Sequence, residues 1–198
     1  MENFQTETIP DPPEQEESGS NWRRAVLDVL ETILLSVLLF VGINAVSSRI
    51  RVESISMQPT LYAGDFVLVN KLAYQLGEPH RGDIIVFRYP PDPTQVPYIK
   101  RVIGLPGDDV HIANGQVYIN GNLLAEPYLT VRTNHGGDWK VPANSLFVMG
   151  DNRNNSSDSR SWGFVPLGNV IGKAEVIYWP PEKWDMLNVP SAVAANQP

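Results

Sequence analysis

Residues 114–121 read Asn-Gly-Gln-Val-Tyr-Ile-Asn-Gly, and this stretch indicates how the chain folds. A run of β-formers, Gln116-Val-Tyr-Ile119, lies between two Asn-Gly dipeptides. Asn-Gly is favoured in two-residue hairpin turns because both positions of such a turn need a positive φ. We therefore expect short strands that follow one another through tight turns.

Five more runs of β-branched and aromatic residues follow residue 50, and prolines stand at several of their ends. They are Phe66-Val-Leu-Val69, Asp83-Ile-Ile-Val-Phe87, Tyr98 to Ile103, Leu146 to Met149, and Glu175 to Trp179. No helical period of 3.6 residues persists among them for ten residues. The sequence predicts a mainly β domain over residues 49–189, with residues 190–198 as a flexible C-terminus.

A long hydrophobic segment precedes this β region. The seventeen residues from Thr32 to Ser48 carry no charge. As a helix they would extend roughly 25 Å, the short limit for crossing a bilayer core. Apolar residues continue upstream as far as Trp22, so we expect one transmembrane anchor over residues 22–48. The alternatives are a buried soluble helix and a signal peptide cleaved near Ala45-Val-Ser47.

The flanking charges do not orient this segment, because two arginines stand on each side of it. These are Arg23 and Arg24 before it and Arg49 and Arg51 after it. The positive-inside rule compares such flanks, and here the comparison is a tie.

The acidic charge of the chain is concentrated at its N-terminus. The chain has 22 Asp and Glu against 15 Lys and Arg, and six of the acids lie within residues 1–17. Residues 1–20 are polar and interrupted by prolines, so we expect a disordered acidic tail. The remainder is close to neutral and shows no basic face, which argues against a nucleic-acid partner. The absence of cysteine excludes disulfides, thiolate metal sites and cysteine nucleophiles.

Ser54-Ile-Ser-Met-Gln-Pro-Thr-Leu61 is the first stretch with candidate chemistry. In an extended segment the hydroxyls of Ser54 and Ser56 point the same way, and Pro59 restrains the turn that follows. One serine could be a nucleophile and the other an oxyanion donor. The alternative is a Ser/Thr-rich turn that leaves a membrane helix.

Tyr98-Ile-Lys-Arg-Val-Ile-Gly104 is the second stretch. In a strand, Lys100 and Arg101 face opposite sides, so one of them points at apolar neighbours. A buried lysine loses its proton easily and can then serve as a general base for a serine. The alternative is a surface pair in which one cation is solvated and the other snorkels.

Residues 150–160, Gly-Asp-Asn-Arg-Asn-Asn-Ser-Ser-Asp-Ser-Arg, form the third stretch. Its composition is typical of a loop rich in Asx and Ser/Thr turns. An EF-hand calcium loop would need a glycine and a distal glutamate that are missing here. Asp158 and Arg160 could pair, and Ser156 could orient an amine nearby. The alternative is a polar loop without a catalytic role.

A serine–histidine–aspartate triad is a further alternative. None of the three histidines, His80, His111 and His135, adjoins a nucleophile-elbow pattern. We therefore do not expect a histidine base, and too few histidines are present for a metal cage.

Taken together, the order and the amino-acid sequences of these stretches resemble those of bacterial type I signal peptidases, which are membrane-anchored serine–lysine proteases. The matching runs are residues 54–61, 64–66, 81–87, 98–108 and 150–160, within a resemblance that covers Trp22 to Trp179. The chain has one visible membrane segment where some members have two, and its stretch between Lys100 and Gly150 is compact. These departures leave the matching motifs intact.

The resemblance implies roles for individual residues. Ser56, directly before a methionine, matches the nucleophile, and Lys100, directly before an arginine, matches the general base. Ser54 matches the hydroxyl that completes an oxyanion hole with the Ser56 backbone N–H.

Three residues of the 150–160 stretch match supporting positions of the family. Ser156 matches the serine that orients the lysine. Asp158 matches the carboxylate that braces the loop, against Arg160.

The resemblance further implies a fold and an activity. The fold would be a coiled antiparallel β-sheet, partly barrel-like, behind a single N-terminal transmembrane helix. The activity would be removal of N-terminal signal peptides from exported preproteins after small residues, without metal or cofactor. The partners would be preproteins and the lipid bilayer, with the N-terminus cytoplasmic and the catalytic domain extracytoplasmic.

Two other functions remain open from the residues themselves. One is a membrane-tethered β-barrel binding module without catalytic activity. The other keeps the serine–lysine chemistry but cleaves a cytosolic or self substrate.

Overall fold

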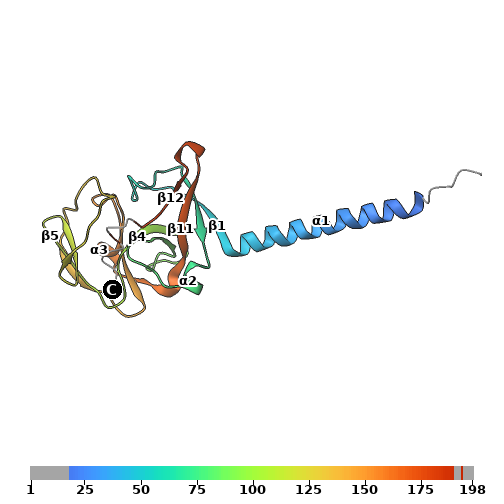
Figure 1. The fold of residues 1–198 in the computed structure, drawn as a ribbon. Helices are drawn as coiled ribbons and strands as arrows, with labels where there is room; N and C mark the ends of the chain where they lie inside the picture. Colours follow the sequence, from blue (N-terminus) through green and yellow to red (C-terminus); the bar gives the residue numbers. More distant parts are fainter. Residues whose placement is uncertain (1–17, 190–192, 194–198) are drawn as a thin grey trace, which may run out of the picture. The chain divides into compact units, whose positions relative to one another are not determined.

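The structure is a computed structural model that describes residues 18–189 and residue 193 (Figure 1). It divides into one unit up to Ile43 and a second from Asn44 onward. Of the tail expected at residues 1–20, residues 1–17 lie outside the described residues. The flexible terminus expected at 190–198 also lies outside them, except for Val193, which is buried.

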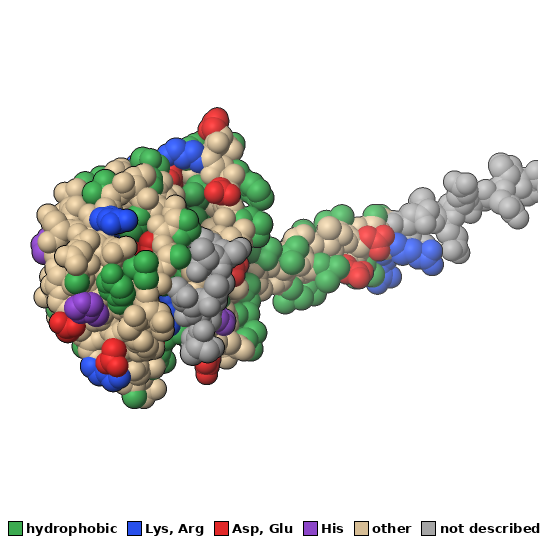
Figure 2. Space-filling view, turned by 60° about the vertical axis from the view of Figure 1, so that its left-hand side comes forward, with side chains coloured by type: hydrophobic (Ala, Val, Ile, Leu, Met, Phe, Trp, Pro, Cys, Tyr) green, Lys and Arg blue, Asp and Glu red, His purple; other side chains and the backbone are tan. Residues whose placement is uncertain are grey.

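In the described residues the first unit consists of an apolar helix, α1 (Ser18–Val46), whose last three residues belong to the second unit. Within it, Trp22–Val46 has a mean hydropathy of 2.4 and is long enough to cross a membrane. None of these apolar side chains is buried, and charged side chains gather near one end of the helix (Figure 2). The helix stops two residues before the end of the expected anchor, because Ser47 and Ser48 pair with another strand.

The second unit contains an antiparallel sheet of eight strands in the order β1-β2-β11-β3-β4-β9-β10, with β12 paired to β11. The strands are β1 (Ser47–Arg51), β2 (Phe66–Asn70), β3 (Ile84–Phe87), β4 (Tyr98–Gly104), β9 (Ser145–Met149), β10 (Val165–Pro166), β11 (Val170–Trp179) and β12 (Asp185–Met186). Strand β11 shifts register three times along its pairs with β2 and β3. Such irregularities bend a strand, and the sheet is curled into a half-barrel. The mainly β prediction is confirmed.

A smaller antiparallel sheet has the order β7-β6-β5-β8. Its strands are β5 (Asp109–Ala113), β6 (Gln116–Ile119), β7 (Asn122–Leu123) and β8 (Gly137–Lys140). Asn114 and Gly115 join β5 to β6 with φ of 52° and 75°, as the hairpin prediction requires. The division into two sheets was not expected from the sequence.

Both faces of the larger sheet are buried in its middle. In β3, Ile84 and Val86 pack into one apolar cluster, and Ile85 and Phe87 pack into another. This explains why β3 is a continuous apolar run and not an alternating one. The smaller sheet packs through a third cluster that includes Phe147 of β9. Lys100 in β4 is thereby placed on a rigid, well-covered strand.

Short helical turns complete the second unit. They are α2 (Ala73–Leu76), α3 (Ser159–Trp162), η1 (Leu167–Asn169) and η2 (Pro181–Lys183).

Candidate active site

Ser56 lies in a tight turn that follows β1. The backbone N–H of Gln58 donates to the carbonyl of Ile55, and that of Leu61 donates to the carbonyl of Met57. Met57 and Leu61 are fully buried, so their side chains anchor the turn to the hydrophobic core. Ser56 is itself 7% exposed, and its carbonyl accepts a hydrogen bond of 3.0 Å from the backbone N–H of Asn152.

Lys100 reaches Ser56 from β4. Its Nζ lies 2.7 Å from Ser56 Oγ, although the two residues are 44 positions apart in the sequence. The ammonium also lies 2.9 Å from the carbonyl oxygen of Ile99, and the residue is 3% exposed. The structure thus brings together the hydroxyl and the amine of two separate stretches.

The environment of Lys100 favours its neutral form. Burial lowers the pKa of Lys100 from the ordinary 10.5 to about 8, although the charges of Asp158 and Asp151 act to raise it. Desolvation penalises the ammonium more than the amine. A substantial fraction of the lysine is therefore neutral near pH 8, and a neutral amine at hydrogen-bond distance can take a proton from a serine.

Ser54 lies beside the same hydroxyl. Its Oγ is 3.1 Å from Ser56 Oγ, as expected for two side chains on one side of an extended segment. Ser54 is exposed, whereas Ser56 is buried. A hydroxyl in this place can donate to an oxyanion that forms on a carbonyl attacked by Ser56.

Asp158 and Arg160 form a buried bidentate pair, with Nε to Oδ1 at 2.8 Å and Nη2 to Oδ2 at 2.7 Å. Asp158 also accepts the backbone N–H of Gly150 at 3.0 Å. Burial acts to raise the pKa of Asp158, but the hydrogen bond and charge of Arg160 outweigh it and leave this pKa below its usual value. The pair holds the ends of the polar loop together.

Ser156 lies in this loop, close to the carbonyl of Ser56. Its hydroxyl oxygen is buried, and in the described part of the chain no hydrogen bond joins it to Lys100 Nζ. A Cβ placed on Gly150 would meet both Ser156 Oγ and the carbonyl oxygen of Ser56. Only a glycine lets the loop approach the nucleophile this closely.

Two buried arginines support the site and were not identified from the sequence. Arg101 donates to both carboxylate oxygens of Asp151, at 2.8 and 2.7 Å, and Arg153 pairs with Glu126 in the same bidentate manner. Both Lys100 and Arg101 are buried, so the surface-pair alternative is wrong for this strand. The only sign of them in the sequence was the polar run after Gly150, which contains Asp151 and Arg153. The partners of these two residues, Arg101 and Glu126, lie far away in the sequence.

The histidines lie away from the proposed dyad. His80 neighbours Asp83, His111 contacts Asp138, and no described histidine contacts Ser56 or Lys100. Within residues 18–189 and 193, no group of three or more His, Asp or Glu side chains could hold a metal ion. On the face of the second unit shown in Figure 2, basic side chains are scattered among acidic and apolar ones.

Two hollows border the segment that carries Ser56, one lined by residues before Ser56 and the other by residues after it. The first, about 100 Å³, is mostly apolar; its lining includes Ile50, Val52, Ser54, Val86, Ile99 and Lys100. The second, about 310 Å³, is more polar; its lining includes Gln58, Tyr62, Thr130, Val131, Asp151 and Asn152. The two hollows share no lining residue.

The sequence was compared with protein families and with known proteins. Residues 25–179 match the family described as signal peptidase, peptidase S26. A signal peptidase I of Leptolyngbya laminosa is 43% identical, over 83% of this chain and 85% of the relative. A signal peptidase I of Bacillus caldolyticus is 37% identical, over 84% of this chain and 94% of the relative. The crystal structure of an Enterococcus faecalis signal peptidase I is 37% identical, with a TM-score of 0.43, over 49% of this chain and 97% of that one. The chain therefore belongs to the signal peptidase family, peptidase S26.

Proposed function

We propose that this chain is a membrane-bound endopeptidase that cleaves signal peptides from exported preproteins, with Ser56 as nucleophile and neutral Lys100 as general base. The observation that carries the proposal is the 2.7 Å separation of Lys100 Nζ and Ser56 Oγ in a buried setting. Membership of the family supports a peptidase acting on preproteins.

The first half of the reaction forms an acyl-enzyme. Lys100 takes the proton of Ser56 Oγ, which attacks the carbonyl carbon of the scissile peptide. The Ser56 backbone N–H and the Ser54 hydroxyl stabilise the resulting oxyanion. Lys100 then gives its proton to the departing amine, so the mature protein leaves with a new N-terminus and the leader stays as an ester on Ser56.

The second half releases the leader. Lys100, neutral again, removes a proton from a water molecule that attacks the ester carbonyl, and Ser56 leaves as the restored hydroxyl. Asp158, held by Arg160, keeps the polar loop and its Ser156 against the dyad. No metal or cofactor takes part in these steps.

The first hollow supports a preference for small residues before the cut. Its volume of about 100 Å³ and its lining by Val52, Val86 and Ile99 suit short apolar side chains. The backbones of Glu53 and Ser54 form no hydrogen bond with other described residues, so an extended peptide can pair with them as an added strand. Alternate side chains of that peptide, one and three residues before the cut, would face the hollow.

The apolar helix supports attachment to a membrane. Trp22–Val46 is long enough to span the hydrocarbon core, and its apolar side chains are exposed. We place the N-terminus in the cytoplasm and the catalytic unit on the extracytoplasmic side, where cleavage sites of exported proteins emerge.

The test uses the full chain in detergent with a purified preprotein. The expected product is the mature protein, with an N-terminus generated after a small residue, and Ser56→Ala should produce none. If the chain were a binding module without catalytic activity, the preprotein would stay intact with the wild type as well as with Ser56→Ala. Cleavage by Ser56→Ala at the wild-type rate would exclude Ser56 as the nucleophile.

A further inference from the structure

We infer that the second hollow beside Ser56 binds the first residues of the mature protein, which follow the cut, and that it sets the enzyme's preference on that side. We call it the mature-side pocket; its lining includes Gln58, Tyr62, Thr130, Val131, Asp151 and Asn152. This inference rests on the proposed function, because it concerns the same substrate.

The position of the pocket follows from its bonds to the nucleophile's own turn. The backbone N–H of Asn152 donates to the Ser56 carbonyl at 3.0 Å, and its side-chain amide donates to the Ile55 carbonyl at 3.1 Å. Gln58 lines the pocket from the other end of the turn. The wall of the pocket is thus bonded directly to the two peptide units that flank the Cα of Ser56.

An extended substrate must pass both hollows. A strand advances about 3.3 Å per residue, so a few residues before and after the cut lie within reach of Ser56. The first hollow is lined by Ser54 and Lys100 and takes the leader side in the proposed function. The mature-side pocket is lined instead by Gln58, which follows Ser56, and by Asn152, which is bonded to the Ser56 carbonyl, so we place there the chain that leaves Ser56 in the other direction.

The chemistry of the pocket is polar but electrically balanced. Its buried carboxylate, Asp151, is neutralised by Arg101, and its buried guanidinium, Arg153, is neutralised by Glu126. The exposed wall carries uncharged groups such as the side chain of Thr130. Such a surface can bind peptide backbone and uncharged polar side chains while it tolerates many mature sequences. A charge introduced into this wall should therefore create a preference that the native pocket lacks.

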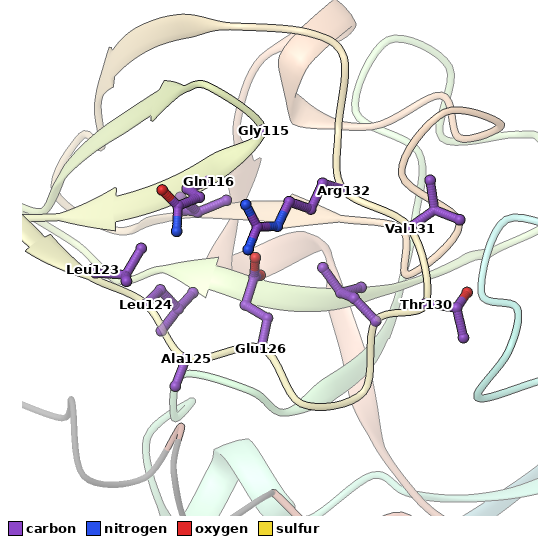
Figure 3. Close-up of a pocket in the computed structure, with 11 residues that line it drawn as sticks. Gly115, Gln116, Leu123, Leu124, Ala125, Glu126, Thr130, Val131 and Arg132 are labelled. Atoms are coloured by element: carbon purple, nitrogen blue, oxygen red, sulfur yellow. The ribbon is translucent and has the colours of Figure 1, made fainter.

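The chain offers a matched control position. Thr130 and Val131 also border a different pocket of about 390 Å³ next to the smaller sheet. Ala125 lines that other pocket but not the mature-side pocket, and its side chain is exposed, as is that of Thr130. In Figure 3 the two residues lie at opposite ends of the same irregular segment. A charge at Ala125 alters the net charge equally but does not line the mature-side pocket.

The experiment uses full-length enzyme in detergent at 0.15 M salt with peptide substrates of one leader sequence. Lys or Glu is placed in turn at each of the first four mature positions, and kcat/KM is measured for the wild type, Thr130→Glu, Thr130→Lys, Ala125→Glu and Ala125→Lys. We expect Thr130→Glu to raise the Lys-over-Glu ratio about two- to fivefold at one or two neighbouring positions, and Thr130→Lys to lower it similarly. Screening over about 8 Å should leave the Ala125 variants near the wild-type ratio.

Each other outcome has a definite meaning. If the wild type cleaves every peptide but the ratio stays constant in the Thr130 variants, or shifts equally in the Ala125 variants, the inference is wrong. It is equally wrong if Thr130 charges change the preference only for residues placed before the cut. If the wild type cleaves no peptide and no preprotein, the proposed function fails, and the inference fails with it.

Discussion

Arg101 and Asp151 form a bidentate ion pair inside the protein, across 50 positions of sequence. Asp151 also accepts the hydroxyl of Thr60, at 2.5 Å, from the turn that contains Ser56. The ring of Tyr128 covers the guanidinium, with 3.9 Å between Cζ and the ring centroid. Arg101 and Asp151 therefore connect strand β4, the Ser56 turn and the polar loop, which together form the site.

This pair predicts a specific pattern of stability. Asp151→Asn leaves a buried guanidinium without its counter-charge, so we expect a loss of about 3–5 kcal/mol in the free energy of unfolding. The double variant Arg101→Met/Asp151→Leu removes both charges and should lose less than the single variant. Denaturant unfolding of the three proteins in detergent measures this, and a double variant that is less stable than Asp151→Asn would contradict it.

The pH dependence of cleavage tests Lys100. Only the neutral amine acts as a base, and its pKa of about 8 lies within the working range. We expect kcat/KM to fall about tenfold per pH unit below that pKa and to level off above it. Lys100→Arg should be inactive throughout, because a guanidinium keeps its proton. Lys100→Arg that cleaves with an unchanged pH profile would exclude the proposed base.

Ser54 and Ser56 are distinguished by the size of their effects. Ser54→Ala retains the nucleophile, the base and the Ser56 backbone N–H, so kcat should fall about 10²–10³-fold with KM little changed. Ser54→Thr keeps a hydroxyl and should recover much of the loss. Single-turnover rates on one preprotein decide between the two roles. If Ser54 were the attacking group, Ser56→Ala would be the milder of the two alanine variants.

Gly150→Ala should impair the site through a steric clash. The added methyl group would meet the Ser56 carbonyl oxygen and Ser156 Oγ, so the loop must withdraw from the turn. We expect a loss of about 1–3 kcal/mol in stability and a marked fall in kcat. Gly168→Ala is the matched control, since a Cβ there meets nothing within 4 Å. Equal activity of the two variants would show that the close approach is not needed.

Membrane orientation is tested with sealed inside-out vesicles that contain the full chain. Added protease should remove about the first twenty residues and leave the catalytic unit intact, because we place that unit inside such vesicles. Digestion of the catalytic unit without vesicle lysis would reverse the assignment. Lysis with detergent before digestion is the control that shows the unit is accessible to the protease.

The sequence predicted the local features of the fold better than the long-range ones. The strands formed by β-branched runs and the turn at Asn114-Gly115 depend on residues next to one another in the sequence, so local patterns predicted them. The division into two sheets depends on pairings between distant strands, which no local pattern specifies. The burial of Arg101 was missed for the same reason, because its counter-charge, Asp151, comes from a remote loop.

The site shows the same limit. Each of the three polar stretches had an ordinary structural explanation when taken alone, and it was their joint resemblance to a family that selected Ser56 and Lys100. The structure places these two side chains in contact. The lowered pKa of Lys100 depends on desolvation by strands from much of the chain, which residue type and spacing alone could not indicate.

The order of strands has a consequence for the newly made protein. Strand β11, near the end of the chain, lies between β2 and β3, which come much earlier. Until residue 179 has been synthesised and delivered, those earlier strands lack their shared neighbour, and the core cluster that they form with β11 is incomplete. Lys100 adjoins Ile99 of that core, so the base we propose should stay hydrated and protonated until β11 is in place.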